Sequence, residues 1–408
     1  MDRASTPIRV GLVLSGGGAR GAYEAGVICH VVEHVLPKLP PGSEFHVVSG
    51  TSVGAIHAAY VMASAEAPPA ERARQLAATW SEMVVSNVVR LGMSDLVGVP
   101  LRALGWTRLT RRAGDGDGEV IGGLVDVSPL ERIVAEGIPW RTLPASLSRG
   151  RALCVSCTDV GSGRPTVFLD GPLADPSPWA YDPNATALRT TIGPAHVRAS
   201  AAIPYLFPAV RVGERYYVDG GLRMNTPLSP ALRLGCNRVL VLAVKHRRPP
   251  DAALPEFPVE SVTKPAFLLG KVLDALLLDQ LEVDLQRMQV VNALLERGME
   301  AFGADFLPKI NEAVRAKRGV GYRTVEHVVV RPREDIGAIA AAAYRKRPRG
   351  SLGVLPELLT RLALRGVPDF EADLLSYVFF DGVFTRELLA LGREDARRHE
   401  DEILALWS

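Results

Sequence analysis

Two glycine turns, each lying between an apolar strand and a helix, constrain the fold of this chain more than any other feature. Residues 8–14 form a continuous apolar run that ends in Ser-Gly-Gly-Gly, and residues 22–35 follow with valines at helical spacing. Residues 45–48 form a second apolar run that ends in Ser-Gly, and small and apolar residues follow over 55–65. Short continuous apolar runs are typical of buried parallel strands. The alternation of strand and helix therefore predicts an α/β layer fold.

The rest of the sequence predicts further strands and then, near residue 245, a change to a mainly helical pattern. The expected strands are 153–158, 166–169, 215–218 and 238–244. Beyond residue 245 the pattern is mainly helical, with leucines along one side of an amphipathic stretch over 264–300. One more apolar run, 326–331, is expected to rejoin the sheet as a strand. We therefore predict a core over 8–245 and a mainly helical extension over 246–408.

Composition narrows the class of protein. The 408 residues are 47% hydrophobic and 23% charged, which is usual for a soluble globular chain. The formal net charge of +2 gives no general basic field, so no nucleic-acid partner is expected. No run approaches the ~18 apolar residues of a membrane span, and the N-terminal residues lack the pattern of a secretory signal. We expect a cytoplasmic protein whose contact with membranes is at most peripheral.

The four cysteines predict neither a disulfide scaffold nor a metal site. Cys154 and Cys157 are the one close pair, and they lie in a predicted strand. Residues three apart on a strand point to opposite faces, so these two thiols cannot hold one ion together. No second close pair completes a set of four ligands. We expect both to be core residues.

The first glycine turn, SGGGARG, has two interpretations. Its Gly16, Gly18 and Gly21 have the spacing of a dinucleotide fingerprint, but the second strand ends in Ser49-Gly50 and supplies no acidic residue for a ribose. The same glycines at a helix N-terminus present unobstructed amides to an anion. That anion is either a phosphate or the oxyanion of a tetrahedral intermediate. We favour the anion cradle over the dinucleotide site.

The second glycine turn has the form of a nucleophile elbow. Gly50-Thr51-Ser52-Val53-Gly54 is a GxSxG sequence directly after a strand and before a helix. In that setting a sharp turn exposes the serine oxygen, and the flanking glycines remove side chains that would clash. A helix N-cap is the structural alternative for Ser52. The strand–turn–helix context favours a nucleophile.

A serine nucleophile needs a group that takes its proton. Asp219 follows a predicted strand and opens the sequence DGG, which is also a common hairpin turn. Asp159 is a second carboxylate at a strand end. A conventional Ser-His-Asp triad would instead use His196, His246 or His327. His246 and His327 follow Asp219, but neither has a glycine or loop context that points at the serine.

Four blocks taken together, SGGGARG, GTSVG, ASAAIPYLFP and VDGG, resemble the patatin-like phospholipases in their order and rough spacing. The resemblance spans roughly residues 8–230. It implies a three-layer α/β/α patatin-like fold with a mainly parallel central sheet and a catalytic core over 8–245. Residues 246–408 resemble, more loosely, the largely helical C-terminal extension of some bacterial members.

The resemblance also implies the site residues. Ser52 is the nucleophile and Asp219 its base, as a Ser–Asp dyad. The glycine-rich loop supplies the oxyanion hole through Gly16, Gly17 and Gly18, supported by Arg20. Ser200, in the ASxxxP segment, is a structural element. This chemistry requires no cofactor and no metal.

The expected activity is hydrolysis of lipid acyl esters, of the phospholipase A or lysophospholipase type. The alternatives are a Ser-His-Asp carboxylesterase for small soluble esters and a non-catalytic regulator that binds a lipid or a nucleotide. A lipid substrate implies an apolar entrance, roofed by residues 170–187 or 91–104, and peripheral contact with a membrane or micelle. Basic clusters at 108–112, 246–248 and 345–349 are candidates for headgroup contact.

Overall fold

The computed structural model describes residues 7–88, 110–112, 119–121, 126–204, 207–246, 280–347 and 373–408. Five consecutive strands of the sheet run parallel, in the order β11-β10-β1-β2-β5. These strands are β1 (Val10–Leu14), β2 (Val47–Thr51), β5 (Ala152–Asp159), β10 (Arg238–Leu242) and β11 (Glu326–Val330). The predicted strand at 326–331 thus lies beside β10 in the sheet.

Two groups of strands extend the sheet beyond β5. β6 pairs antiparallel with one edge of β5 and carries β7, while β9 pairs antiparallel with β5 and continues through β8 and β4 to β3. The bounds of these strands are β3 (Thr110–Arg112), β4 (Glu119–Ile121), β6 (Pro165–Asp170), β7 (Thr186–Arg189), β8 (Ala209–Val212) and β9 (Arg215–Asp219).

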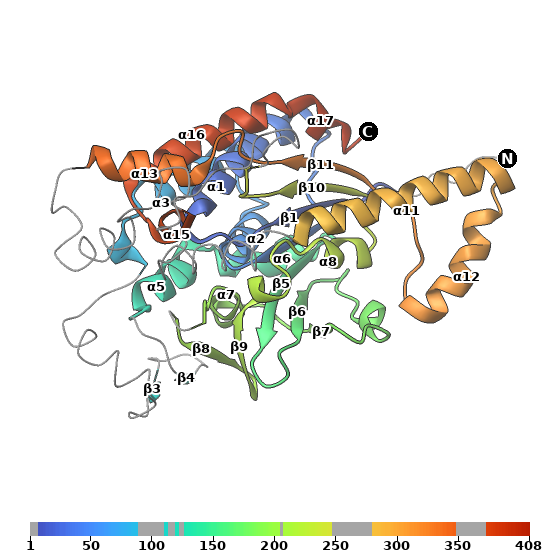
Figure 1. The fold of residues 1–408 in the computed structure, drawn as a ribbon, viewed down its shortest axis with the longest axis horizontal. Helices are drawn as coiled ribbons and strands as arrows, with labels where there is room; N and C mark the ends of the chain where they lie inside the picture. Colours follow the sequence, from blue (N-terminus) through green and yellow to red (C-terminus); the bar gives the residue numbers. More distant parts are fainter. Residues whose placement is uncertain are drawn as a thin grey trace, which may run out of the picture.

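Helices cover both faces of the sheet (Figure 1). Leu12 and Leu14 of β1 pack into a hydrophobic cluster with α1, α2, α3, α13 and α16, whereas Val13 points to the other face and packs with α8 and α11. The α-helices are α1 (Gly21–His30), α2 (Val53–Ala63), α3 (Pro69–Ser81), α5 (Ser128–Gly137), α6 (Leu143–Leu147), α7 (Pro194–Ser200), α8 (Leu228–Arg233), α11 (Gln280–Phe302), α12 (Phe306–Arg318), α13 (Ile336–Lys346), α15 (Asp373–Val378), α16 (Gly382–Arg398) and α17 (Glu400–Ala405). The predicted three-layer α/β/α fold is confirmed.

The cysteines lie where the strand alternation places them. Cys154 belongs to the hydrophobic cluster under α8 and α11, and Cys157 to the cluster on the opposite face of the sheet. All four cysteines are buried and free. The prediction that Cys154 and Cys157 are core residues on opposite faces is confirmed.

The C-terminal region packs directly on the first helix of the chain. A Cβ on Gly26 would lie 2.3 Å from the carbonyl oxygen of Leu389, and one on Gly392 would lie 2.1 Å from that of Tyr23. The two glycines therefore allow α1 and α16 to cross at backbone contact, as the upper part of Figure 1 shows. The Tyr23 hydroxyl also donates to Asp395 over 3.1 Å. The described part of the extension is thus built into the core, and the boundary at residue 245 stays a prediction.

The long helix expected over 264–300 is described from its middle onward. α11 covers Gln280–Phe302, and residues 264–279 lie outside the described residues. Across the described ranges, no helix combines the length and the apolar character that crossing a bilayer demands.

Candidate active site

One edge of β5 brings Ser52 and Asp219 together. β2 pairs in parallel with the first part of β5, and its last residue, Thr51, lies opposite Ser156. β9 pairs antiparallel with the last part of β5, and its last residue, Asp219, lies opposite Cys157. Because β6 occupies the other edge of β5, β2 and β9 meet end to end on the same edge. The residue after Thr51 and the residue that ends β9 are therefore spatial neighbours, although they lie far apart in the sequence.

Ser52 occupies a strained turn between β2 and α2. Its backbone has φ +56° and ψ −126°, and it is the one non-glycine residue of the described ranges with a positive φ. Such a conformation costs about 1–3 kcal/mol and is found mainly at functional sites. A Cβ on Gly50 would lie 2.1 Å from the carbonyl oxygen of Gly54, so close backbone packing requires the flanking glycine. The turn places Ser52 at the start of α2, where the residue as a whole is 6% exposed.

Asp219 is the hydrogen-bonding partner of that hydroxyl. Its carboxylate accepts hydrogen bonds from the Ser52 hydroxyl and from the Gly221 amide, the latter over 2.7 Å. Burial raises the pKa of Asp219 to about 6, while the two hydrogen bonds oppose the rise. Within the described ranges no lysine or arginine forms an ion pair with it. The carboxylate is therefore a stronger base than an exposed aspartate and is already in contact with the proton it would accept.

The glycine-rich loop lies against Ser52. A Cβ on Gly16 would be 3.1 Å from the Cβ of Ser52. The Gly16 amide already donates to the carbonyl oxygen of Asn225 over 3.0 Å, and the Asn225 Nδ2 donates back to the Gly16 oxygen over 3.2 Å. The amides of Gly17 and Gly18 have no acceptor in the part of the chain that the structure describes. Of the three predicted oxyanion donors, Gly16 is thus engaged, and Gly17 and Gly18 keep unpaired amides.

Arg20 joins this loop to the C-terminal region. It is buried, its Nε donates to Ser376 Oγ over 2.8 Å, and its guanidinium lies 4.2 Å from the ring centroid of Tyr377. Gly18, at φ +56°, also meets α15 so closely that a Cβ would lie 2.3 Å from the Tyr377 carbonyl oxygen. A residue with a side chain would be both strained and blocked there. α15 therefore fixes the position of the loop, and Arg20 supports the loop through α15.

A buried polar network lies beneath the loop, and the sequence analysis missed it. Glu24, which is fully buried, accepts from the Ser15 amide over 2.8 Å and contacts His57 Nδ1 over 2.7 Å. Trp80 Nε1 donates to His57 Nε2 over 2.9 Å. Since an indole nitrogen can only donate, the histidine proton is on Nδ1 and points at Glu24. The signal was present in the sequence as single polar residues, Glu24 and His57, within otherwise apolar helices.

Two further residues hold the nucleophile and the loop in place. The Ser52 amide donates to Ser200 Oγ over 2.9 Å, and that hydroxyl donates to the Ser156 carbonyl over 2.6 Å. Ser200 therefore has the position of a structural residue. Asn225, which clamps Gly16, was not predicted, because a polar residue shortly after DGG fits an ordinary loop equally well.

The rival bases lie elsewhere. All eight histidines fall in the described ranges, and none of them hydrogen-bonds to Ser52 or Asp219. Asp159 accepts from Ser162 and pairs with Arg215 at 3.4 Å. The three candidate histidines have other partners: His196 accepts from the Gly193 amide at 3.1 Å, His246 bonds to the Pro332 oxygen at 2.9 Å, and His327 bonds to Gln289 at 3.4 Å. Across the described residues no group of three His, Cys, Asp or Glu side chains could hold a metal ion.

Of the two segments expected to roof the entrance, only one lies in the described residues. Residues 170–187 pack against α8 and the end of α12, where Asp182 pairs with Arg233 at 2.6 Å and Pro178 meets Gly319. The segment 91–104 lies outside the described residues. Of the residues in the basic clusters, Arg108, Arg247, Arg248 and Arg349 also lie outside the described residues. Arg347, which is described, pairs with Asp381 at 3.1 Å.

Comparisons with known proteins bear on the family. A search of the curated proteins found no match to this chain. Among solved structures, the chain is similar to VipD from Legionella pneumophila, at 14% identity and a TM-score of 0.32, over 92% of this chain and 67% of that one. The family model described as patatin-like phospholipase matches residues 12–232, more than half of the sequence. The chain therefore belongs to the patatin-like phospholipase family, whose members are generally lipid acyl hydrolases.

Proposed function

We propose that this protein hydrolyses fatty acyl esters of lipids with a Ser52–Asp219 dyad. The observation that carries the proposal is that β2 and β9, on the same edge of β5, place the Ser52 hydroxyl beside the buried Asp219 carboxylate. The substrate class follows from the family, and the activity is of the phospholipase A or lysophospholipase type.

The first half of the reaction forms an acyl-enzyme. Asp219 takes the hydroxyl proton while Ser52 Oγ bonds to the ester carbonyl carbon, and the carbonyl oxygen becomes an oxyanion. The amides of Gly17 and Gly18 donate to that oxyanion. One such donor is worth about 2.7–4 kcal/mol in a comparable acyl-transfer site. When the tetrahedral intermediate collapses, the leaving alcohol takes the proton from Asp219.

The second half clears the acyl group. Asp219 accepts a proton from a water molecule, whose oxygen bonds to the acyl carbon. The new oxyanion is held by the same amides, and Ser52 leaves with the proton returned by Asp219. The products are a fatty acid and an alcohol, here a lysolipid or a glycerol derivative. Neither a metal nor an organic cofactor takes part in the proposed reaction.

A lipid substrate implies that the enzyme works at an interface. We propose peripheral contact with a membrane or micelle, with the substrate ester entering the site from the lipid phase. Its direct test is sedimentation of the protein with vesicles that contain the substrate lipid.

The decisive test combines labelling with lipid analysis. A fluorophosphonate probe should bond to Ser52 Oγ with loss of fluoride, and peptide mass spectrometry should locate the adduct there. Phospholipid and lysophospholipid extracts incubated with the wild-type chain should release fatty acid. Ser52→Ala should abolish both results.

Ser64→Ala is the matched control, because Ser64 is a buried serine directly after α2 that bonds only to carbonyl oxygens of its own helix. It should keep full labelling and full hydrolysis. Ester hydrolysis that survives in Ser52→Ala would reject the dyad. A wild-type chain that neither labels nor releases fatty acid would instead support a non-catalytic lipid-binding role.

A further inference from the structure

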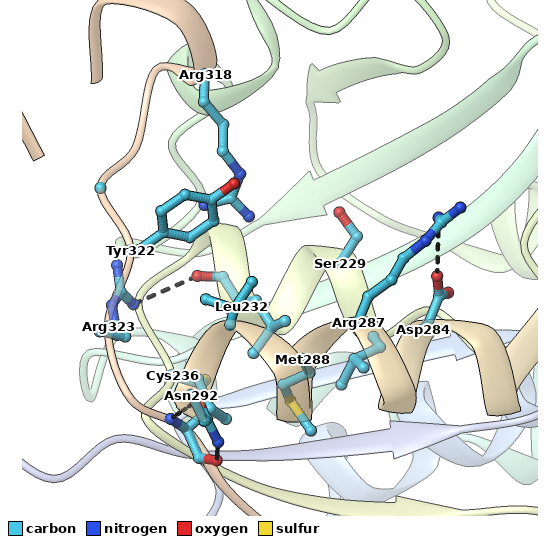
Figure 2. Close-up of a pocket in the computed structure, with 14 residues that line it drawn as sticks. Ser229, Leu232, Cys236, Asp284, Arg287, Met288, Asn292, Arg318, Tyr322 and Arg323 are labelled. Carbon is cyan, nitrogen blue, oxygen red and sulfur yellow. Dashed lines mark hydrogen bonds and ion pairs between the residues drawn. The ribbon is translucent and has the colours of Figure 1, made fainter. Parts of the chain in front are cut away.

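A cavity separate from the dyad lies between α8, α11 and the segment that joins α12 to β11 (Figure 2). Its volume is about 360 Å³, which is within the range of ~300–1,000 Å³ typical of small-molecule sites. α11 lines it with a helical stripe of residues that includes Asp284, Arg287, Met288 and Val291. This cavity lies on the sheet face covered by α8 and α11.

The floor of the cavity is apolar. Leu228, Met288 and Val325 are buried residues of the hydrophobic cluster on this face, and Leu232 packs against that cluster. All four line the cavity. A ligand that fills the cavity therefore buries hydrocarbon against hydrocarbon, which favours an apolar chain.

One side of the cavity carries arginines without a counter-ion. Figure 2 shows Arg318 extending toward Tyr322, with Arg323 on the same side, and the Arg318 guanidinium lies 4.9 Å from the tyrosine ring centroid. Arg323 donates to the Leu232 carbonyl oxygen over 3.3 Å. Throughout the described ranges, neither guanidinium has a carboxylate within ion-pair distance. Burial lowers the pKa of Arg323, and the neighbouring charges of Arg318, Arg9 and Arg315 lower it further.

The opposite side of the cavity is electrically balanced. Arg287 lies 3.8 Å from Asp284, which is the one carboxylate among the described residues that line the cavity. Among the described residues that line the cavity, Arg318 and Arg323 therefore carry the uncompensated charge. Two like charges near a half-buried apolar surface are stabilised when an anion binds between them.

We propose that this cavity binds a long-chain fatty acid, with its carboxylate at Arg318 and Arg323 and its chain over the floor formed by Leu228, Leu232 and Met288. A planar guanidinium matches a carboxylate through two parallel hydrogen bonds. A singly charged head fits better than a phosphate dianion, because Asp284 lines the same cavity. A fatty acid is also the product of the proposed hydrolysis, but binding here does not require that the hydrolysis occurs.

The test measures binding to the full-length Ser52→Ala chain, which does not turn over esters under the proposed function. Isothermal titration with dodecanoate below its micelle concentration gives the affinity. A dodecanoate carrying a diazirine at its chain end is then cross-linked, and peptide mass spectrometry maps the adduct. We expect adducts in α11, near Met288 and Val291, in addition to any at the dyad.

Two pairs of variants distinguish recognition of the fatty-acid carboxylate from recognition of its hydrocarbon chain. Arg318→Gln should weaken dodecanoate binding about tenfold or more, whereas Lys309→Gln, at an exposed position of the same helix, should change it less than about twofold. Val291→Trp should fill the cavity and remove the α11 adducts. Leu294→Trp, at a position that is 65% exposed on α11, should leave them unchanged.

Three further ligands complete the test, and each can overturn the proposal. Dodecan-1-ol that binds as tightly as dodecanoate would show that the arginines do not recognise a head. Inorganic phosphate that binds as tightly would show that the chain is irrelevant. Dodecyl phosphate that binds more tightly than dodecanoate would show that the cavity prefers a phosphate monoester head to a carboxylate. Adducts confined to the peptides of Ser52 and Asp219 would reject the site, whatever the outcome for hydrolysis.

Discussion

Two buried carboxylates near the glycine-rich loop, Asp219 and Glu24, have different surroundings. Asp219 accepts from a serine hydroxyl and one backbone amide. Glu24 accepts from a backbone amide and from a histidine whose second nitrogen is occupied by Trp80. Burial raises the pKa of both. Burial alone therefore does not distinguish a base from a structural acid.

The difference lies in what each partner can give up. The Ser52 hydroxyl can transfer its proton and become a nucleophile, and it lies in a strained turn at a strand end. The His57 proton is locked between Glu24 and the Trp80 contact, and it leads to no reacting atom. The first region is arranged for proton transfer and the second for holding Ser15, the residue before the loop. Substitutions in the two regions should separate activity from stability.

The largest effect is expected for Asp219→Asn. The amide keeps the shape and its oxygen can still accept from the Gly221 amide, but it cannot take a proton, so ester hydrolysis should fall about 10⁴-fold. The charged carboxylate is costly to bury, and the rise in pKa from 3.8 to about 6 corresponds to about 3 kcal/mol at pH 8. Asp219→Asn should therefore gain up to about that much stability. Steady-state kinetics and urea unfolding at pH 8 measure the two quantities.

Hydrolysis within tenfold of wild type in Asp219→Asn would contradict the assignment of the base. A loss of activity accompanied by a loss of stability would instead indicate that the carboxylate is needed for folding. If Asp219 is the base, Asp219→Asn should lower the activity and raise the stability.

The pattern of the sequence predicted one of these regions and not the other. Ser52 and Asp219 lie in turn sequences at strand ends, where functional residues of α/β folds are commonly found. The resemblance to the family is what predicted that these two residues act together. Their contact depends on the pairing of β2 and β9 with one edge of β5, which no local pattern encodes. The engagement of Gly16 by Asn225 depends on the same long-range pairing.

The periodicity of apolar residues predicted the strands, the helices and the layered fold, but not how particular helices contact one another. The order of the layers and the strand at 326–331 follow from apolar runs. The crossing of α1 and α16 depends instead on Gly26 and Gly392, whose only sequence signal is a glycine inside a helix. Glu24 and His57 were missed because each is an isolated polar residue until the helices pack together.

The loop that joins the two regions can be tested with Gly18→Ala. The added methyl group would lie 2.3 Å from the Tyr377 oxygen, so α15 and the loop must separate and displace the amides of Gly17 and Gly18. Activity should fall about 10²–10³-fold, as it does when an oxyanion donor is removed. Gly42→Ala is the control, because Gly42 also has a positive φ but has no atom within 4 Å of the added carbon. Equal activity losses in both variants would show that backbone strain, and not the contact with α15, is responsible.

The pH dependence should report Asp219 alone. The base must be ionised, so kcat/KM for an uncharged ester should be constant above pH 6 and fall about tenfold per pH unit below it. Because the folded-state pKa is raised, the stabilising contribution of protonation is complete below pH 3.8 and is lost as pH rises through about 6. The stability difference between Asp219→Asn and wild type should therefore close as the pH is lowered from 8 to 4. An inflection in activity near 7 or above would point to a different base.

The smallest effect on activity is expected for Glu24→Gln, which tests whether the second buried carboxylate contributes to stability only. The glutamine oxygen can still accept from Ser15, but its amide would face the protonated Nδ1 of His57, and turning the imidazole over would lose the bond from Trp80. One buried donor is then left unsatisfied, which costs about 1–3 kcal/mol of stability. Hydrolysis should fall less than tenfold.

The control for Glu24→Gln is Glu300→Gln, which removes an exposed ion pair with Arg297 and should cost less than about 1 kcal/mol. Urea unfolding and kinetics on the same preparations provide both readouts. If Glu24→Gln instead lost as much activity as Asp219→Asn while remaining folded, the His57 proton would be coupled to the reaction. The two buried carboxylates would then belong to one catalytic unit, and the distinction drawn from their partners would be wrong.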